Sequence, residues 1–211
     1  DAPVAELATT GLPTVALRCP AHPAMQDLIA ATDKPLAAPS ANASGRISST
    51  SAAHVMKTLK SRIPLVIDGG PAREGLESTI VAVTDEAVTL LRPGPIPFEE
   101  IRRVSGLSTG TASGAIEAPG QLRSHYAPSK PLRLDAEAPR ADEWMIGFGP
   151  VGGDDTLSAK GDVVEAAAPL FSALHRADAS GKSAIAVAPI PAEGLGAAIN
   201  DRLKRAAAPR P

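Results

Sequence analysis

The stretch KPLAAPSANASGR, residues 34–46, runs from a short apolar segment into a loop crowded with polar side chains. Apolar residues that end at a Pro-Ser pair are typical of a buried strand, so we expect a strand at Leu36–Ala38. The loop then carries several hydroxyl groups, one amide and the guanidinium of Arg46, and we expect a helix over Ser51–Lys60 behind it. Because the first N–H groups of a helix lack backbone partners, such a junction suits a phosphate or another anion. The alternative is a surface loop whose serines only cap the helix.

Apolar and polar runs alternate on both sides of this stretch, and the pattern predicts a mixed α/β fold. A strong turn signal, Gly69-Gly70-Pro71, closes one apolar run. A short polar break, Thr84–Glu86, joins two others into an expected hairpin. The further strands expected here are Thr14–Arg18, Pro64–Asp68, Ser78–Val83 and Ala87–Leu91, and the further helices are His22–Ala31 and Phe98–Val104.

The composition favours a compact α/β protein over other classes. Hydrophobic residues make up 44% of the 211 residues but aromatic residues only 2%, so the cores must be built from Ala, Val, Leu and Ile. The formal net charge is −2, which argues against direct binding of nucleic acid. Cys19 is the sole cysteine, which excludes an intrachain disulfide and a cysteine-based zinc cluster. No apolar run reaches the roughly 18 residues of a membrane span, so we expect a cytoplasmic enzyme without a membrane partner.

The second half of the chain begins with a change of character. Gly, Ser, Thr and Ala dominate Ser105–Gly120, which predicts a flexible linker. A small Rossmann-like α/β domain is expected after it. We therefore divide the chain into residues 1–104, 105–130 and 131–211. The expected strands of the last part are Leu132–Leu134, Glu143–Gly147 and Ala184–Ala188, and the expected helices are Asp162–Ala177 and Glu193–Ala207.

Five motifs follow one another in a specific order. They are GLPTVALR (residues 11–18), PSAN (39–42), DGGP with GLESTIV (68–71 and 75–81), LLRPG (90–94) and SHYAP (124–128). In this order they resemble the threonylcarbamoyl-AMP synthase family in its long form, which has a YrdC-like catalytic domain, a linker and a C-terminal domain. The family's basic Lys-x-Arg motif has no counterpart near residue 1, so we expect the N-terminal part of the catalytic domain to be absent from this sequence.

The resemblance implies an activity and its reactants. A member of this family makes threonylcarbamoyl-AMP and pyrophosphate from L-threonine, bicarbonate or CO2, and ATP. The product serves the threonylcarbamoyladenosine modification of tRNA through downstream threonylcarbamoyl transfer proteins. This chemistry needs no covalent enzyme intermediate, so positioning and charge neutralisation provide most of the acceleration. No residue is therefore assigned as catalytic.

The resemblance also implies residue roles. L-threonine would be bound by Arg18, Ala38 and Ser78, and ATP would be bound by Thr14, Ser40, Asn42, Ser48, Arg92 and Tyr126. Tyr126 would close over the nucleotide from the linker as a lid. Mg2+ is expected to accompany ATP and to be held by the triphosphate and water, because no carboxylate cluster is available and no metal site is predicted.

Two other functions remain open from the sequence. One keeps the fold and changes the acyl acceptor, as in the carbamoyl-adenylate-forming domain of a hydrogenase-maturation protein. The other is a non-catalytic RNA-binding module that uses the same concave surface, although the near-zero net charge counts against it.

Overall fold

A computed structural model describes residues 4–9, 11, 14–112 and 124–209. The chain divides into two compact units, Asp1–Ser40 and Ala41–Pro211. The first unit contains two helices, α1 (Glu6–Thr9) and α2 (Pro23–Thr32). Helix α2 has a proline in its first turn, where the missing N–H costs nothing, and it ends at Asp33 in the left-handed conformation (φ 49°).

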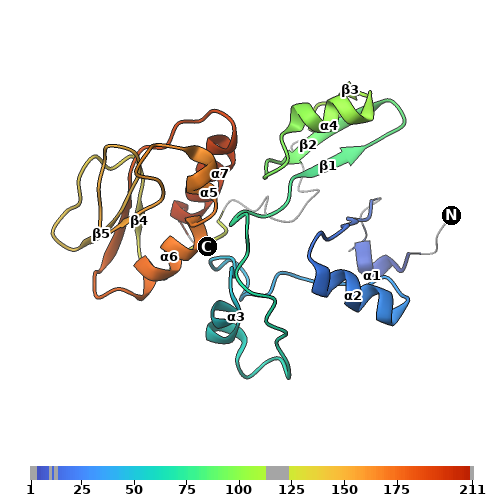
Figure 1. Cartoon of the computed structure of the whole chain (residues 1–211), viewed down its shortest axis with the longest axis horizontal. Helices are drawn as coiled ribbons and strands as arrows, with labels where there is room; N and C mark the ends of the chain where they lie inside the picture. Colours follow the sequence, from blue (N-terminus) through green and yellow to red (C-terminus); the bar gives the residue numbers. More distant parts are fainter. Residues whose placement is uncertain (1–3, 10, 12–13, 113–123, 210–211) are drawn as a thin grey trace. The chain divides into compact units, whose positions relative to one another are not determined.

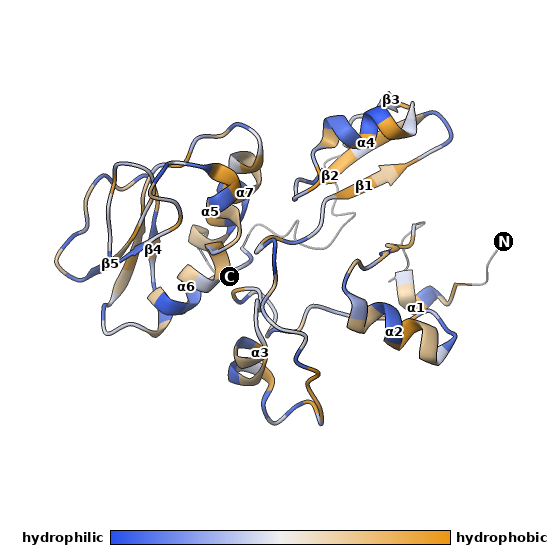
Figure 2. Ribbon diagram, in the orientation of Figure 1, coloured by the Kyte–Doolittle hydropathy of each residue, from blue (hydrophilic) through white to orange (hydrophobic). Residues whose placement is uncertain are grey.

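The second unit begins with loop 41–50 and helix α3 (Ala52–Leu59). The Ser51 side chain caps α3 by accepting a hydrogen bond from the backbone N–H of His54 at 3.4 Å. The predicted hairpin follows as strands β1 (Ile80–Val83) and β2 (Ala87–Arg92), which pair antiparallel. Figure 2 shows both strands as hydrophobic, and Val88 of β2 is fully buried. Helix α4 (Phe98–Ser105) comes next and ends at Gly106 (φ 68°).

Strand β3 (Ser108–Thr109) adds to the hairpin by pairing parallel to β2. This pairing makes a three-stranded mixed sheet in the order β1-β2-β3. β3 lies at the start of the predicted linker, so the polar residues there extend the sheet instead of leaving it. Residues 113–123 of the predicted linker lie outside the described part of the chain. The domain boundaries at 104 and 130 stay a prediction.

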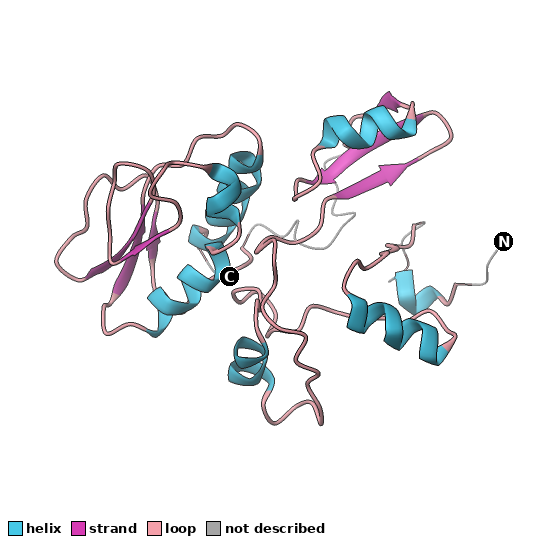
Figure 3. Ribbon diagram, viewed as in Figure 1, coloured by secondary structure: helices cyan, strands magenta, loops and turns pink. Residues whose placement is uncertain are grey.

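The C-terminal part forms a parallel sheet in the order β4-β7-β5-β6. Its strands are β4 (Leu132–Arg133), β5 (Glu143–Gly147), β6 (Asp155–Thr156) and β7 (Ala184–Val187). Helices α5 (Val163–Ala167), α6 (Leu170–Ala179) and α7 (Leu195–Ala207) lie in a layer beside it (Figures 1 and 3). The buried core sits mainly between this sheet and its helices and includes Phe171, Ile185 and Ile199. The predicted α/β fold class is confirmed.

The helix predicted over Asp162–Ala177 is two helices. The periodicity of its apolar residues is helical throughout, but Pro169 lies between α5 and α6 and cannot donate a backbone hydrogen bond. Gly75 (φ 60°) lies directly against this break: a side chain at position 75 would collide with the carbonyl groups of Ala167 and Ala168. A glycine is therefore required there for both its conformation and its close approach.

Three predicted strands are wrong. Thr14–Arg18, Leu36–Ala38 and Pro64–Asp68 are irregular segments, and none of them pairs with another strand within the described residues. Their apolar side chains remain largely in solvent, since the exposed fractions of Leu17, Leu65 and Ile67 are 88%, 73% and 66%. Apolar, β-branched sequence favours a strand, but only ladder partners make one.

Candidate functional site

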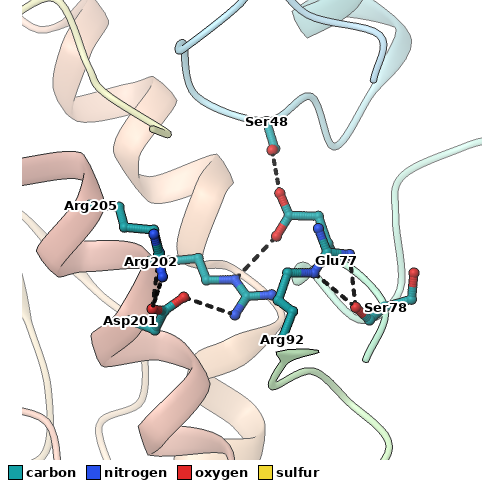
Figure 4. A network of polar contacts seen from close by, with 7 residues as sticks. All are labelled: Ser48, Glu77, Ser78, Arg92, Asp201, Arg202 and Arg205. Carbon is teal, nitrogen blue, oxygen red and sulfur yellow. Dashed lines mark hydrogen bonds and ion pairs between the residues drawn. The ribbon is translucent and has the colours of Figure 1, made fainter. Parts of the chain in front are cut away.

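Glu77 lies at the centre of a polar network within the second unit (Figure 4). One of its carboxylate oxygens accepts a hydrogen bond from the Ser48 hydroxyl at 2.6 Å. The other accepts from Nε of Arg202 at 3.2 Å. The carboxylate therefore joins loop 41–50 to helix α7, and its partner Arg202 is 125 residues away from Glu77 in the sequence.

Arg92, at the end of β2, fixes the backbone next to Glu77. Its side chain is almost fully buried, and its Nε and Nη2 groups donate to the carbonyl oxygen of Ser78 at 3.1 and 2.8 Å. Gly94 lets the two segments approach closely, because a side chain there would collide with the backbone of Glu77–Thr79. The LLRPG and GLESTIV motifs thus form one rigid corner of the sheet.

Loop 41–50 presents Ser48 from a well-ordered turn. The Asn42 amide donates to the carbonyl oxygens of Ala43 and Arg46 at 2.9 and 3.2 Å, and Asn42 is buried. Gly45 (φ 74°) supplies the left-handed residue of the turn. The structure therefore shows Asn42 holding the loop, and Ser51 rather than Ser48 caps α3. The Ser48 hydroxyl is left to interact with Glu77.

Helix α6 holds the same loop through a pair of histidines. The His175 ring stacks on the His54 ring with centroids 3.7 Å apart, and His175 Nε2 lies 3.1 Å from the Ser48 carbonyl oxygen. Because the carbonyl can only accept, Nε2 is the protonated nitrogen. Burial, reinforced by His54, lowers the pKa of His175 to about 4, so the ring is neutral at pH 7.

Tyr126 is fully buried in the described part of the chain and adopts a left-handed conformation (φ 61°). The neighbouring backbone anchors it, because the Ala127 N–H donates to the Gly45 carbonyl oxygen at 2.9 Å. Its ring lies 5.3 Å from the Phe171 ring, and the Arg202 guanidinium lies 5.9 Å from its centre. Burial, followed by the nearby Glu77 charge, raises the pKa of Tyr126 to about 12, so its phenol stays protonated.

The predicted site residues fall into two groups. Thr14, Arg18, Ala38 and Ser40 belong to the first unit, and all four are exposed in irregular segments there. The others belong to the second unit, where the network around Glu77 brings together Ser48, Ser78, Arg92 and Tyr126, with Asn42 in the supporting loop.

Sequence reasoning missed His175 and Arg202, which lie on helices α6 and α7. A signal was present in α7. Arg202 falls on the same helical stripe as Ile199 and Leu203, both of which are buried. An arginine inside an apolar stripe is uncommon and indicates a buried charge with a specific partner. The described residues contain no group of three or more His, Cys, Asp or Glu side chains placed to hold a metal ion.

Comparison with known proteins covers nearly the entire chain. The family model described as "Telomere recombination" matches residues 1–94, and the model described as "Threonylcarbamoyl-AMP synthase, C-terminal domain" matches residues 96–208. The chain belongs to the threonylcarbamoyl-AMP synthase family. The resemblance of the five motifs is thereby confirmed. In the described residues, no helix has both the length and the apolar character needed to cross a membrane.

Individual members of the threonylcarbamoyl-AMP synthase family align over the same range. Threonylcarbamoyl-AMP synthase of Pyrococcus abyssi is 37% identical over 96% of this chain, and that of Bacillus subtilis is 36% identical over 96%. The chain spans about two thirds of the length of these relatives, 66% and 65% respectively. The crystal structure of P. abyssi Sua5 complexed with L-threonine superposes with a TM-score of 0.83 at 36% identity, covering 97% of this chain and 67% of that one.

Proposed function

We propose that this protein is an L-threonylcarbamoyladenylate synthase. The observation that carries the proposal is the likeness, over 97% of the chain, to a Sua5 protein whose crystal structure is complexed with L-threonine. The match of residues 96–208 to the C-terminal domain of threonylcarbamoyl-AMP synthase favours this function over a hydrogenase-maturation domain, which embeds the catalytic part differently.

The proposed reaction has three bond-making or bond-breaking steps. The amine of L-threonine attacks CO2, which is in equilibrium with bicarbonate, and loses a proton to solvent as the carbamate forms. A carbamate oxygen then attacks the α-phosphorus of ATP. The bond from that phosphorus to the bridging oxygen breaks, and pyrophosphate leaves. Each step gains most from orientation and from charge neutralisation, so no nucleophilic side chain is needed.

The residue roles we propose form two sets, one for L-threonine and one for the nucleotide. Arg18 would bind the threonine carboxylate with its guanidinium, Ala38 would contact the amino acid through its backbone, and Ser78 would hydrogen-bond to it. Thr14, Ser40, Asn42, Ser48, Arg92 and Tyr126 would serve the nucleotide. Arg92 supports this assignment, because a guanidinium forms charge-assisted hydrogen bonds with phosphate oxygens.

The cofactor and partners belong to the proposal as well. Mg2+ would accompany ATP and take its ligands from the triphosphate and water. The product would pass to threonylcarbamoyl transfer proteins for modification of tRNA. We propose that residues 1–104 form the catalytic part, 105–130 the connection and 131–211 the C-terminal domain.

Pyrophosphate release tests the proposed function in the natural full-length protein. Release should require ATP, bicarbonate and L-threonine together, and mass spectrometry should detect threonylcarbamoyl-AMP. L-Serine and L-valine are the matched controls, because each lacks one of the two groups on the threonine β-carbon. Release that proceeds equally without threonine, or with either control, would contradict the proposal.

A further inference from the structure

The position of Arg202 buries a guanidinium charge, which costs free energy of folding. Its side chain is 0% exposed, and the partners that face it are Glu77 at 3.2 Å and Asp201 at 3.4 Å. Its Nη2 atom is buried without a hydrogen-bond partner among the described residues. A buried guanidinium with long contacts and an unsatisfied N–H group does not stabilise a fold better than an apolar residue of similar size. Stability alone therefore does not account for it.

Arg202 orients the carboxylate of Glu77. The Glu77 side chain is 22% exposed, so water can reach it and compete for its carboxylate oxygens. The Arg202 Nε group binds one carboxylate oxygen and leaves the other directed at the Ser48 hydroxyl, which lies 2.6 Å away. Figure 4 shows this relay running from α7 to the loop that carries Ser48. The location of the Ser48 hydroxyl therefore depends on a charge in the C-terminal part of the chain.

We propose that Arg202 is a positioning residue for the nucleotide site, acting through Glu77 on Ser48. The inference rests on the function proposed above, in which Ser48 contacts ATP. Arg202 itself touches neither substrate in this scheme. The C-terminal part thereby contributes to nucleotide binding through one buried side chain, and Glu77 has an orienting role.

Equilibrium titration with ATP tests the proposal in the natural full-length protein. Arg202→Met keeps most of the side-chain volume and removes the charge, and it should weaken ATP binding about tenfold, a typical coupling within one polar network. Arg205→Met is the matched control, because Arg205 lies on the same helix and pairs with Asp201 at 2.9 Å. It should change ATP affinity less than about twofold, because both side chains of this pair are partly exposed and such ion pairs contribute little. Equal losses in the two variants would overturn the proposal.

Two further variants keep the test decisive. Arg202→Lys retains the charge without the fork of N–H donors, so its ATP affinity should lie between those of the wild-type and Met proteins, and it serves if Arg202→Met fails to fold. The double variant Glu77→Gln/Arg202→Met should have the same ATP affinity as whichever single variant binds ATP less tightly, because both changes break the same relay. Fully additive losses would show that Arg202 does not act through Glu77.

A readout without nucleotide separates this inference from the proposed function. Ser48→Ala and Arg202→Met should be non-additive in urea unfolding, with the unfolding equilibrium constant of the double variant differing about fivefold from the product of the single effects. Additivity would overturn the relay even in an active enzyme. A wild-type protein that releases no pyrophosphate under any substrate combination would refute the proposed function and leave the unfolding cycle to judge the relay.

Discussion

His175 should make the fold sensitive to mild acid. Its pKa is about 4 in the folded protein, against an ordinary value of 6.5, because it is buried and stacked on His54. The unfolded chain therefore binds a proton at a higher pH than the folded chain does. The stabilisation is fully present above pH 6.5 and is lost as the pH falls toward 4. Over that window the shift corresponds to about 2–3 kcal/mol of unfolding free energy.

Urea unfolding between pH 7 and pH 4.5 measures this effect. The unfolding free energy of the wild-type protein should fall steadily over this range, and that of His175→Gln should fall less. The remaining fall in the variant comes from His54 and His125, because burial lowers the pKa of both. Gln can still donate to the Ser48 carbonyl, so the contact is kept while the titration is removed. His22→Gln, at an exposed histidine before α2, is the control and should follow the wild type.

The lower limit of pH 4.5 avoids a second titration. The Arg133 guanidinium, which bonds to the Glu143 carboxylate, lowers the pKa of that carboxyl to about 2. This pair stabilises the fold above about pH 4.5 and is lost as the pH falls toward 2. If His175→Gln shows the same pH dependence as the wild type between 7 and 4.5, His175 is not the titrating group and the reasoning fails.

Four further substitutions, at three positions, have defined outcomes. Gly94→Ala should destabilise the protein by about 2–4 kcal/mol, because its methyl group collides with the backbone of Glu77–Thr79, and a urea midpoint close to wild type would contradict the close approach. Tyr126→Phe should keep the unfolding free energy within about 1 kcal/mol of the wild-type value, because the buried hydroxyl makes no hydrogen bond within the described residues. Tyr126→Ala should lower the unfolding free energy by about 3–5 kcal/mol, because it removes a buried ring. Equal losses in the two variants would refute this reasoning. Arg18→Ala should raise the KM for L-threonine by about 30-fold or more and leave ATP affinity nearly unchanged, and an equal loss of ATP affinity would move Arg18 to the nucleotide site.

The local sequence pattern predicted the elements whose hydrogen-bonding partners lie close by in the sequence. The hairpin Ile80–Arg92 follows from two apolar runs joined by the polar break Thr84–Glu86, and both the hairpin and helix α4 are found as expected. The strands predicted at Thr14–Arg18 and Pro64–Asp68 depend on ladder partners that a linear pattern does not identify. The break at Pro169 was visible in the sequence, but the apolar periodicity on both sides concealed it.

The candidate site shows the same limit at the level of single side chains. The resemblance to the family implied roles for Ser48, Ser78 and Arg92, and the structure brings these three residues together beside Glu77. The motifs did not predict Arg202, because its partner Glu77 is 125 residues away along the chain. A contact of this length follows from packing, and only the charge inside an apolar helical stripe indicates it in advance.

The contact between Gly75 and the α5–α6 break has a consequence for exchanging parts among relatives. The motif GLESTIV begins at a glycine that leaves no room for a β-carbon beside the carbonyls of Ala167 and Ala168, so the two segments must match closely in shape. In a chimaera whose C-terminal half comes from another family member, the helix break that faces Gly75 has a different shape. Such hybrids should fold only when the helix break and the facing glycine are transplanted together.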